Sequence, residues 1–292
     1  MHFLKQISKQ NWHQVKAKEL LDFGKAELAR NEIGAIDAEL ILAHFLGINR
    51  MELHAKEFEI EDELIIDSFK NAISERLSGK PTQYITGVAP FRYLEYDVGP
   101  GVLIPRPETE ILVDEVLHQL SKYPDPISIV DLGAGAGGIS IALATETHGK
   151  KEVHVIAVEK SKDALNWLHK NITKHEVNVR VVEAGVTEAL IGVKCDVVVA
   201  NPPYLPDEQE IPTELKFEPE LALFGGRGDG MDLPREFIAA ATRLLKSGGL
   251  LAMEHNEVQG PLISKELAAD FEEIATYEDL NERPRFTIAK RK

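Results

Sequence analysis

The sequence is poor in cysteine, in positive charge and in long apolar runs. Cys195 is its only cysteine, so no disulfide can form within the chain, which favours a reducing compartment. Because this cysteine stands at the start of an apolar segment, a small core side chain is expected there rather than a nucleophile. Lysine and arginine number 33 against 48 aspartate and glutamate residues, which gives a formal net charge of −15. So acidic a surface would repel a phosphate backbone, and no stable nucleic-acid binding is expected.

The absence of long apolar runs excludes a membrane-spanning segment. No stretch approaches the roughly 18–20 apolar residues that cross a bilayer, and the N-terminus carries no basic, apolar and cleavable signal pattern. We therefore expect no membrane association and a cytoplasmic protein. Hydrophobic residues still make up 43% of the 292 positions, which is enough for a sizeable core and for more than one domain.

The first region, residues 1–83, is predicted to form a small helical domain. Its apolar residues recur at helical spacing, as at Ile65, Phe69 and Ile73, and Gly79 ends the pattern. No cluster of histidine, cysteine or carboxylate residues at metal-ligand spacing occurs in this region. We interpret it as a module that docks a partner or substrate.

The rest of the chain predicts a β-hairpin followed by an α/β domain. Residues 84–106 are rich in aromatic residues, glycine and proline and contain alternating segments, which indicates a hairpin linker between domains. Residues 107–292 open with a helix and then alternate short apolar runs with helical segments, a pattern typical of a doubly wound parallel sheet. The expected strands are 127–130, 153–158, 179–182, 196–200, 249–253 and a last strand at 285–289.

A glycine-rich loop follows the first apolar run of the α/β domain. The segment 131–138 reads Asp-Leu-Gly-Ala-Gly-Ala-Gly-Gly, and its glycines permit sharp turns and let a ligand approach main-chain N–H groups. The spacing also fits the G-x-G-x-x-G pattern of NAD sites.

Asp131 before the loop would repel a pyrophosphate but suits the ammonium of a methionine moiety, which favours S-adenosylmethionine. Glu159 ends the next strand, where a carboxylate accepts ribose hydroxyls. The plainer alternatives are that Asp131 caps the loop and that Glu159 is a solvated strand end.

The segment Asn201-Pro202-Pro203-Tyr204 directly follows the buried strand Val197–Ala200. Ligands of open α/β sheets bind outside the carboxyl ends of the strands, so this segment should face the cofactor. The Asn201 side-chain oxygen and the Pro202 main-chain oxygen can accept the two hydrogens of an –NH2 group. The prolines stiffen the loop, and Tyr204 offers a flat face to a planar group or a sulfonium. A proline-stiffened turn is the plainer alternative.

This arrangement predicts methylation of a planar amide or amine nitrogen. The lone pair of an amide nitrogen is delocalised, which makes the atom a poor nucleophile. Two acceptors on its hydrogens fix its plane and stabilise the positive charge that develops during transfer. Positioning then supplies much of the rate, and no strong base is needed before the methyl group moves.

Together these motifs resemble the HemK/PrmC family, the peptide chain release factor N5-glutamine methyltransferases. The resemblance covers nearly the whole chain. Besides the glycine loop and the Asn-Pro-Pro-Tyr segment, it is carried by the runs 37–44, 81–87, 102–110 and 218–226, of which Pro105-Arg106-Pro107-Glu108-Thr109 is the most family-specific.

The resemblance implies a class I, Rossmann-like, seven-stranded methyltransferase domain behind the helical domain. It implies S-adenosylmethionine as cofactor and the glutamine of the Gly-Gly-Gln loop of release factors as substrate, with the helical domain gripping the release factor. No metal is expected, because the carboxylates of the chain show no defined ligand spacing. By position, the glutamine amide would be held by Asn201, Pro202, Pro203 and Tyr204, with Asn201, Pro202 and Tyr204 as catalytic residues. The cofactor would be held by Asp131, Gly133, Ala134, Gly135, Ala136, Gly137, Glu159, Val186 and Asn201.

Four other functions are weighed against this one. A ribosomal-protein glutamine methyltransferase would use the same chemistry. An exocyclic-amino methyltransferase of nucleic acids could use the same tetrapeptide, but the acidic chain has no basic recognition segment. Gly185 stands at a position where an acid is usual. This departure, together with Ala134 and Ala136 in the glycine loop, motivates the alternative of a non-catalytic adaptor. An NAD enzyme would lack evident hydride-transfer residues.

The roles of two further residues are not assigned by the motifs. Arg106 either meets a carboxylate of the ligand or ties the hairpin to the following helix. His255 is expected to be packed or solvated.

Overall fold

The computed structural model describes residues 15–55 and 57–292, and the chain divides into two compact units. The first unit comprises the residues up to Gly87 together with Thr213–Phe217, and the second comprises Val88–Pro212 and Glu218–Lys292. The part of the predicted helical domain that covers residues 1–14 lies outside the described residues. Among the residues that are described, no helix combines the length and the apolar character needed to cross a membrane.

The first unit is helical and has its own apolar core. Its three longest helices pack against one another, and Leu20, Ile41 and Phe69 are completely buried between them. Arg76 is also buried and donates to Asp37 Oδ2 at 2.7 Å and to Glu214 Oε2 at 3.3 Å, so the segment Thr213–Phe217 is tied to this unit. The elements are β1 (Val15–Lys16), α2 (Ala17–Ala29), α3 (Ala35–Leu46), α4 (Glu52–Ala55), β2 (Glu59–Ile60), α5 (Glu63–Leu77), α6 (Thr82–Thr86) and the 3-10 helix η1 (Thr213–Phe217).

The second unit is built around a seven-stranded sheet with the order β12-β13-β11-β8-β5-β6-β7. Five neighbouring strands are parallel, whereas β13 is antiparallel to both β11 and β12. The predicted class I fold with seven strands is confirmed. The strands are β5 (Ile127–Leu132), β6 (Val153–Glu159), β7 (Val179–Glu183), β8 (Cys195–Ala200), β11 (Leu245–Glu254), β12 (Phe271–Glu278) and β13 (Pro284–Arg291).

Strand β12 was not among the strands expected from the sequence. It lies at the edge of the sheet, and of its residues only Phe271 is buried. An edge strand that faces solvent needs no apolar run, so the periodicity that marked the other strands is missing here.

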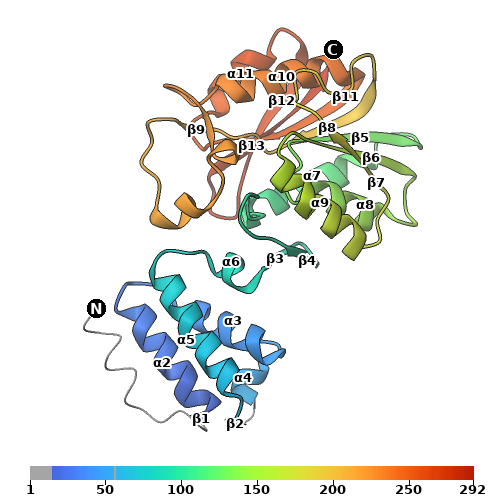
Figure 1. Cartoon of the computed structure of the whole chain (residues 1–292). Helices are drawn as coiled ribbons and strands as arrows, with labels where there is room; N and C mark the ends of the chain where they lie inside the picture. The colour runs from blue at the N-terminus through green and yellow to red at the C-terminus, as the bar shows by residue number, and fades with distance from the viewer. Residues whose placement is uncertain (1–14, 56) are drawn as a thin grey trace. The chain divides into compact units, whose positions relative to one another are not determined.

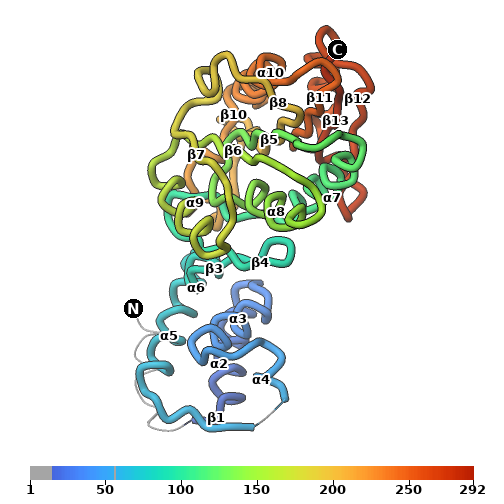
Figure 2. The backbone as a smooth tube through the Cα atoms, turned by 90° about the vertical axis from the view of Figure 1, so that its right-hand side faces the viewer, coloured from blue at the N-terminus to red at the C-terminus, as the bar shows by residue number. Residues whose placement is uncertain are grey.

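Helices cover both faces of this sheet, with α10 and α11 on one face and α7, α8 and α9 on the other (Figure 1). Figure 2, seen after a quarter turn, again separates α10 from α7, α8 and α9 by the strands. Helix α7 begins at Pro107 with acids in its first turn, as its sequence predicts, because proline needs no N–H partner there. The helices are α7 (Pro107–Leu120), α8 (Gly138–Thr147), α9 (Lys162–Lys174), α10 (Asp232–Leu244) and α11 (Gly260–Leu267).

The predicted hairpin forms from β3 (Val88–Phe91) and β4 (Leu94–Asp97), which pair antiparallel in the second unit. Tyr96 is fully buried and donates from its hydroxyl to Gly138 O at 3.2 Å. The Asn171 side chain bonds to the backbone of Asp97 and to Ala136 O. The hairpin is therefore fastened directly to the start of α8 and, through the Asn171 side chain, to the glycine loop.

Candidate active site

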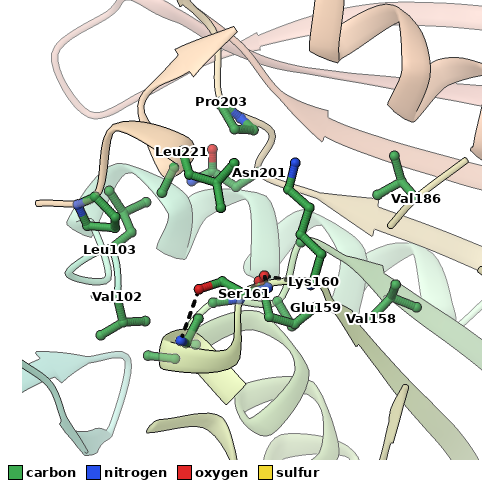
Figure 3. Close-up of a pocket in the computed structure, with 18 of the residues that line it drawn as sticks. Val102, Leu103, Val158, Glu159, Lys160, Ser161, Val186, Asn201, Pro203 and Leu221 are labelled. Atoms are coloured by element: carbon green, nitrogen blue, oxygen red, sulfur yellow. Dashed lines mark hydrogen bonds between the residues drawn. The ribbon is translucent and has the colours of Figure 1, made fainter. Parts of the chain in front are cut away.

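The carboxyl ends of three neighbouring strands carry the polar residues singled out in the sequence. The glycine loop follows β5, Glu159 is the last residue of β6, and Asn201 follows β8 directly. Because these strands are parallel and adjacent in the order β8-β5-β6, the three features share one edge of the sheet. They line one pocket of the second unit. Figure 3 shows Asn201 on the side opposite Glu159.

Eight of the predicted site residues line this pocket. They are Gly133, Ala134, Gly135, Ala136, Glu159, Val186, Asn201 and Pro203. Of the described residues, four others with predicted roles lie outside the pocket lining: Asp131, Gly137, Pro202 and Tyr204.

The glycine loop adopts a backbone that side chains disfavour. Gly133, Gly135 and Gly137 have φ values of 73°, 56° and 91°, a region that L-residues with a Cβ rarely adopt. The N–H groups of Gly133 and Ala134 both donate to Val158 O, at 2.9 and 3.0 Å. At Gly137 a Cβ would also lie 2.7 Å from side-chain carbons of Ile141 and Leu168. The loop is therefore held close to β6, and Gly133, Ala134, Gly135 and Ala136 line the pocket.

Glu159 holds the loop and also faces the pocket. Its Oε2 accepts from Gly135 N at 2.9 Å, and its Oε1 accepts from Lys160 N and Ser161 N, both at 2.7 Å. The side chain is only 8% exposed, yet it belongs to the pocket wall. A carboxylate offers roughly four acceptor positions, of which these bonds use three, so one position suits a ribose hydroxyl.

Asp131 lies behind the loop and caps the following helix. It is 1% exposed, and its Oδ2 accepts from Ser140 N in the first turn of α8 at 3.1 Å. Burial raises the pKa of this carboxyl to about 7. Its Oδ1 has no hydrogen-bond partner within the part of the chain that the structure describes. Because Asp131 does not itself line the pocket, an ordered water that bridges to the amino-acid end of a cofactor would satisfy that oxygen.

Asn201 is oriented by a neighbour from a distant part of the chain. Its Nδ2 donates to Thr109 Oγ1 at 3.1 Å, and no group of residues 15–55 and 57–292 donates to its Oδ1, which can therefore accept from a ligand. Tyr204 does not line the pocket, and its hydroxyl donates to Glu254 Oε1 at 3.4 Å. Burial raises the pKa of this hydroxyl. The main-chain oxygen of Tyr204 accepts from Gln259 Nε2 at 3.0 Å. The loop is thus anchored on both sides of its prolines.

Arg106 lines the pocket and pairs with a carboxylate of the chain itself. Its guanidinium donates to Glu218 Oε1, and Glu218 Oε2 accepts from Ile104 N at 2.9 Å. Glu218 is 4% exposed, so the carboxylate of this charge-assisted pair is shielded from solvent, whereas the Arg106 side chain is partly exposed. The pair ties the segment before α7 to the segment before the 3-10 helix η2 (Glu220–Ala222).

His255 is packed, as the sequence suggested. It is completely buried, with Nε2 bonded to Thr287 Oγ1 at 2.9 Å and Nδ1 to Asn256 O at 2.8 Å. Burial lowers its pKa, so the ring is neutral at physiological pH. Within the described chain it is not part of the pocket wall.

Several apolar wall residues escaped the sequence analysis. Val102 and Leu103 come from the segment after the hairpin, Leu221 from η2 and Phe237 from α10. In Figure 3 the pairs Val102/Leu103 and Val158/Val186 stand at opposite ends of the pocket. The one sequence signal was the apolar run Val102-Leu103-Ile104, because the other residues read as ordinary core positions.

The Asn-Pro-Pro-Tyr loop packs against Gly225 of β10 (Phe224–Gly226), which pairs with β9 (Leu205–Pro206). A Cβ on Gly225 would lie 2.6 Å from Pro203 O, 2.8 Å from Tyr204 Cα and closer still to Gly230 O. Since all three are backbone atoms, no side-chain rotation relieves the clash. We expect Gly225→Ala to lower the free energy of unfolding by about 2–4 kcal/mol and to impair turnover.

Gly228→Ala is the matched control for that prediction. Gly228 lies in the same segment with a φ of 67°, and a Cβ there would meet nothing within 4 Å. Only the backbone penalty remains, about 1 kcal/mol. Urea denaturation of both variants checks the difference, and equal losses would contradict the packing argument.

The comparisons with known proteins cover both units. The family described as PrmC N-terminal domain matches residues 19–87, and the family described as methyltransferase small domain matches residues 108–215. The chain is 40% identical over 263 residues to the release factor glutamine methyltransferase of Streptomyces coelicolor, covering 87% of this chain and 90% of that protein. It is 37% identical to the protein of the same name from Bifidobacterium longum (87% and 91% covered) and 35% identical to that of Xylella fastidiosa (90% and 95% covered).

A solved structure supports the fold. The 16S rRNA N2 G1207 methyltransferase (RsmC) of T. thermophilus, solved in complex with AdoMet and guanosine, superposes with a TM-score of 0.51 at 20% identity. The match covers 70% of this chain and 50% of that one. At this identity it speaks for the shared architecture of the sheet and its helices.

Proposed function

The chain belongs to the release factor glutamine methyltransferase family, and from that premise we propose that it methylates the glutamine of the Gly-Gly-Gln loop of peptide chain release factors. It is an S-adenosylmethionine-dependent methyltransferase. The methyl group goes to the side-chain amide nitrogen N5. The observation that carries the proposal is that Asn201, whose side-chain oxygen can accept a hydrogen bond from an amide –NH2 group, shares a pocket with the glycine loop and Glu159.

The residues present fit the cofactor. The glycine loop and Asp131 suit its amino-acid end, Glu159 suits the ribose, and Val186 with Phe237 forms an apolar wall for a flat base. When bound, S-adenosylmethionine supplies an electrophilic methyl group on a positively charged sulfur.

The chain's own contribution is to hold the glutamine amide. Asn201 Oδ1 accepts one amide hydrogen. The main-chain oxygen of Pro202, whose side chain does not line the pocket but which stands between the lining residues Asn201 and Pro203, accepts the other, so that the nitrogen lone pair is directed across the pocket. Both acceptors stabilise the positive charge that grows on nitrogen, and no strong base is required before methyl transfer. Tyr204 acts indirectly, because its hydroxyl is bonded to Glu254 and steadies the loop.

We propose that the helical unit binds the body of the release factor. We also propose that the protein is located in the cytoplasm, where release factors act on the ribosome. The net charge of −15 supports the absence of stable nucleic-acid binding.

Methyl-label mapping tests the proposal. The purified protein is incubated with methyl-labelled S-adenosylmethionine and with either a release factor or its Gly-Gly-Gln→Gly-Gly-Ala variant, alongside a mixture of ribosomal proteins. We expect label on the loop glutamine alone, located by mass spectrometry, and none on the alanine variant. Label that persists on the alanine variant, or that goes to ribosomal proteins instead, would disprove the substrate.

A further inference from the structure

Asn201 is the end of a buried chain of hydrogen bonds that joins two of the sequence motifs to Glu254, a connection that the sequence did not indicate. Asn201 Nδ2 donates to Thr109 Oγ1 at 3.1 Å, and Thr109 Oγ1 donates to Glu254 Oε2 at 2.6 Å. The three residues come from the end of β8, the first turn of α7 and the end of β11. Thr109 is 4% exposed and Glu254 only 1%, so water competes little for these bonds.

The chemistry of a hydroxyl group determines which atom donates and which accepts in each of these hydrogen bonds. Thr109 has a single hydroxyl hydrogen, and an ionised carboxylate can only accept. The Thr109 hydrogen is therefore committed to Glu254, and the short distance is that of a charge-assisted O–H···O⁻ bond. What remains on Thr109 Oγ1 is lone pairs, so the Asn201 group facing it must be the –NH2 group.

We propose that Thr109 and Glu254 are positioning residues that keep the oxygen of the Asn201 amide, rather than its nitrogen, turned toward the substrate –NH2. The proposal rests on the proposed function. An asparagine amide has nearly the same shape in both orientations, so packing alone selects neither. The reversed orientation would set the Asn201 –NH2 group against the substrate's N–H groups and leave one of the two substrate hydrogens without its acceptor.

Protonation of Glu254 would release this constraint. A protonated carboxyl can donate to Thr109 Oγ1, which frees the Thr109 hydrogen to donate to Asn201 Oδ1 and reverses the amide. Burial raises the pKa of Glu254 to about 7. Around it, Glu108 of α7 raises the pKa further, whereas the hydrogen bonds from Thr109 and Tyr204 and the charge of Arg285 on β13 lower it. Activity should therefore fall as pH drops through this pKa.

The first test compares Thr109→Val with Thr109→Ser. Valine keeps the shape and removes the hydroxyl, and we expect kcat to fall on the order of 10- to 100-fold at saturating substrates. Cofactor affinity should stay within about threefold, and Thr109→Ser, which keeps the hydroxyl, should retain most of the wild-type rate. Thr147→Val is the matched control, because Thr147 is also buried with its hydroxyl bonded only locally, to Leu143 O at 2.6 Å. A wild-type kcat in Thr109→Val, or an equal loss in Thr147→Val, overturns the proposal.

The second test is the pH profile of kcat for the wild type and for Glu254→Gln. The wild type should lose activity below about pH 7, and the glutamine variant should show no such decline, because its side chain does not titrate. A flat wild-type profile, or a decline that survives in Glu254→Gln, overturns the role of Glu254. This comparison remains decisive even if Thr109→Val folds poorly.

A third readout does not depend on the substrate. In ¹⁵N-labelled enzyme with S-adenosylmethionine bound, the Asn201 side-chain NH2 signals should shift with pH near 7 in the wild type and not in Glu254→Gln. If the wild type fails to methylate release factors but shows this shift, the proposed function is wrong and the positioning network stands. If it methylates them and no shift occurs, the network is wrong.

Discussion

Replacing Asn201 with alanine should abolish nearly all methyl transfer while leaving cofactor affinity within about threefold. The variant removes the side-chain oxygen that holds one hydrogen of the substrate amide and stabilises charge in the transition state. Loss of one such group costs about 2–4 kcal/mol, or roughly 30- to 1,000-fold in kcat. It also leaves Thr109 Oγ1 without its donor. Steady-state kinetics with saturating release factor, together with calorimetric titration of the cofactor, measures both quantities.

Asn281→Ala serves as the control for this variant. Asn281 is an exposed asparagine on the turn between β12 and β13, so its loss should change neither rate nor affinity. Turnover of Asn201→Ala at the wild-type rate would show that the substrate amide is held by other groups. A parallel loss of cofactor affinity would instead assign Asn201 to the cofactor.

Replacing Glu159 with alanine should destroy cofactor binding. The carboxylate accepts from three main-chain N–H groups, and its loss leaves Gly135, Lys160 and Ser161 without that acceptor. Unpaired buried donors cost about 1–3 kcal/mol each. The loop would rearrange, and the ribose would lose its partner. We expect the Kd for S-adenosylmethionine to rise by at least about 100-fold, with a lower melting temperature. Calorimetry and thermal denaturation measure these changes.

The neighbouring strand provides a matched control. Glu183 ends β7 and stands in register with Glu159, but its side chain is exposed. Glu183→Ala should bind the cofactor with the affinity of the wild type. Glu159→Gln keeps one acceptor oxygen, so its cofactor affinity should lie between that of the wild type and that of Glu159→Ala. Cofactor affinity within about threefold in Glu159→Ala would refute the assigned role.

The order of motifs along the chain was sufficient to predict one shared site. A glycine loop, an acid and an Asn-Pro-Pro-Tyr segment each follow an apolar run, and the carboxyl ends of parallel strands meet at one edge. Nothing beyond the alternation of strands and helices was needed to bring Gly133, Glu159 and Asn201 together. The start of α7 could also be predicted from the local sequence alone, because Pro107 and the acids after it determine a helix N-terminus.

The orientation of those side chains could not be predicted in the same way. Thr109 stands 92 residues from Asn201, and Glu254 stands 145 residues from Thr109. Their contact depends on how α7 and β11 pack beside β8. The sequence suggested that Tyr204 faces a planar substrate, yet its hydroxyl is bonded to Glu254 outside the pocket lining. Asp131, for its part, caps α8 from behind the loop.

The motifs of the sequence thus determined the family, by resemblance, and the cofactor class, whereas local periodicity and strand direction determined most strands of the sheet and the residues that reach its functional edge. Tertiary structure decided which way Asn201 presents its amide, which apolar residues close the pocket, and which buried carboxylates have a raised pKa. Those properties arise from hydrogen bonds and desolvation between segments far apart in the chain, about which local pattern carries no information.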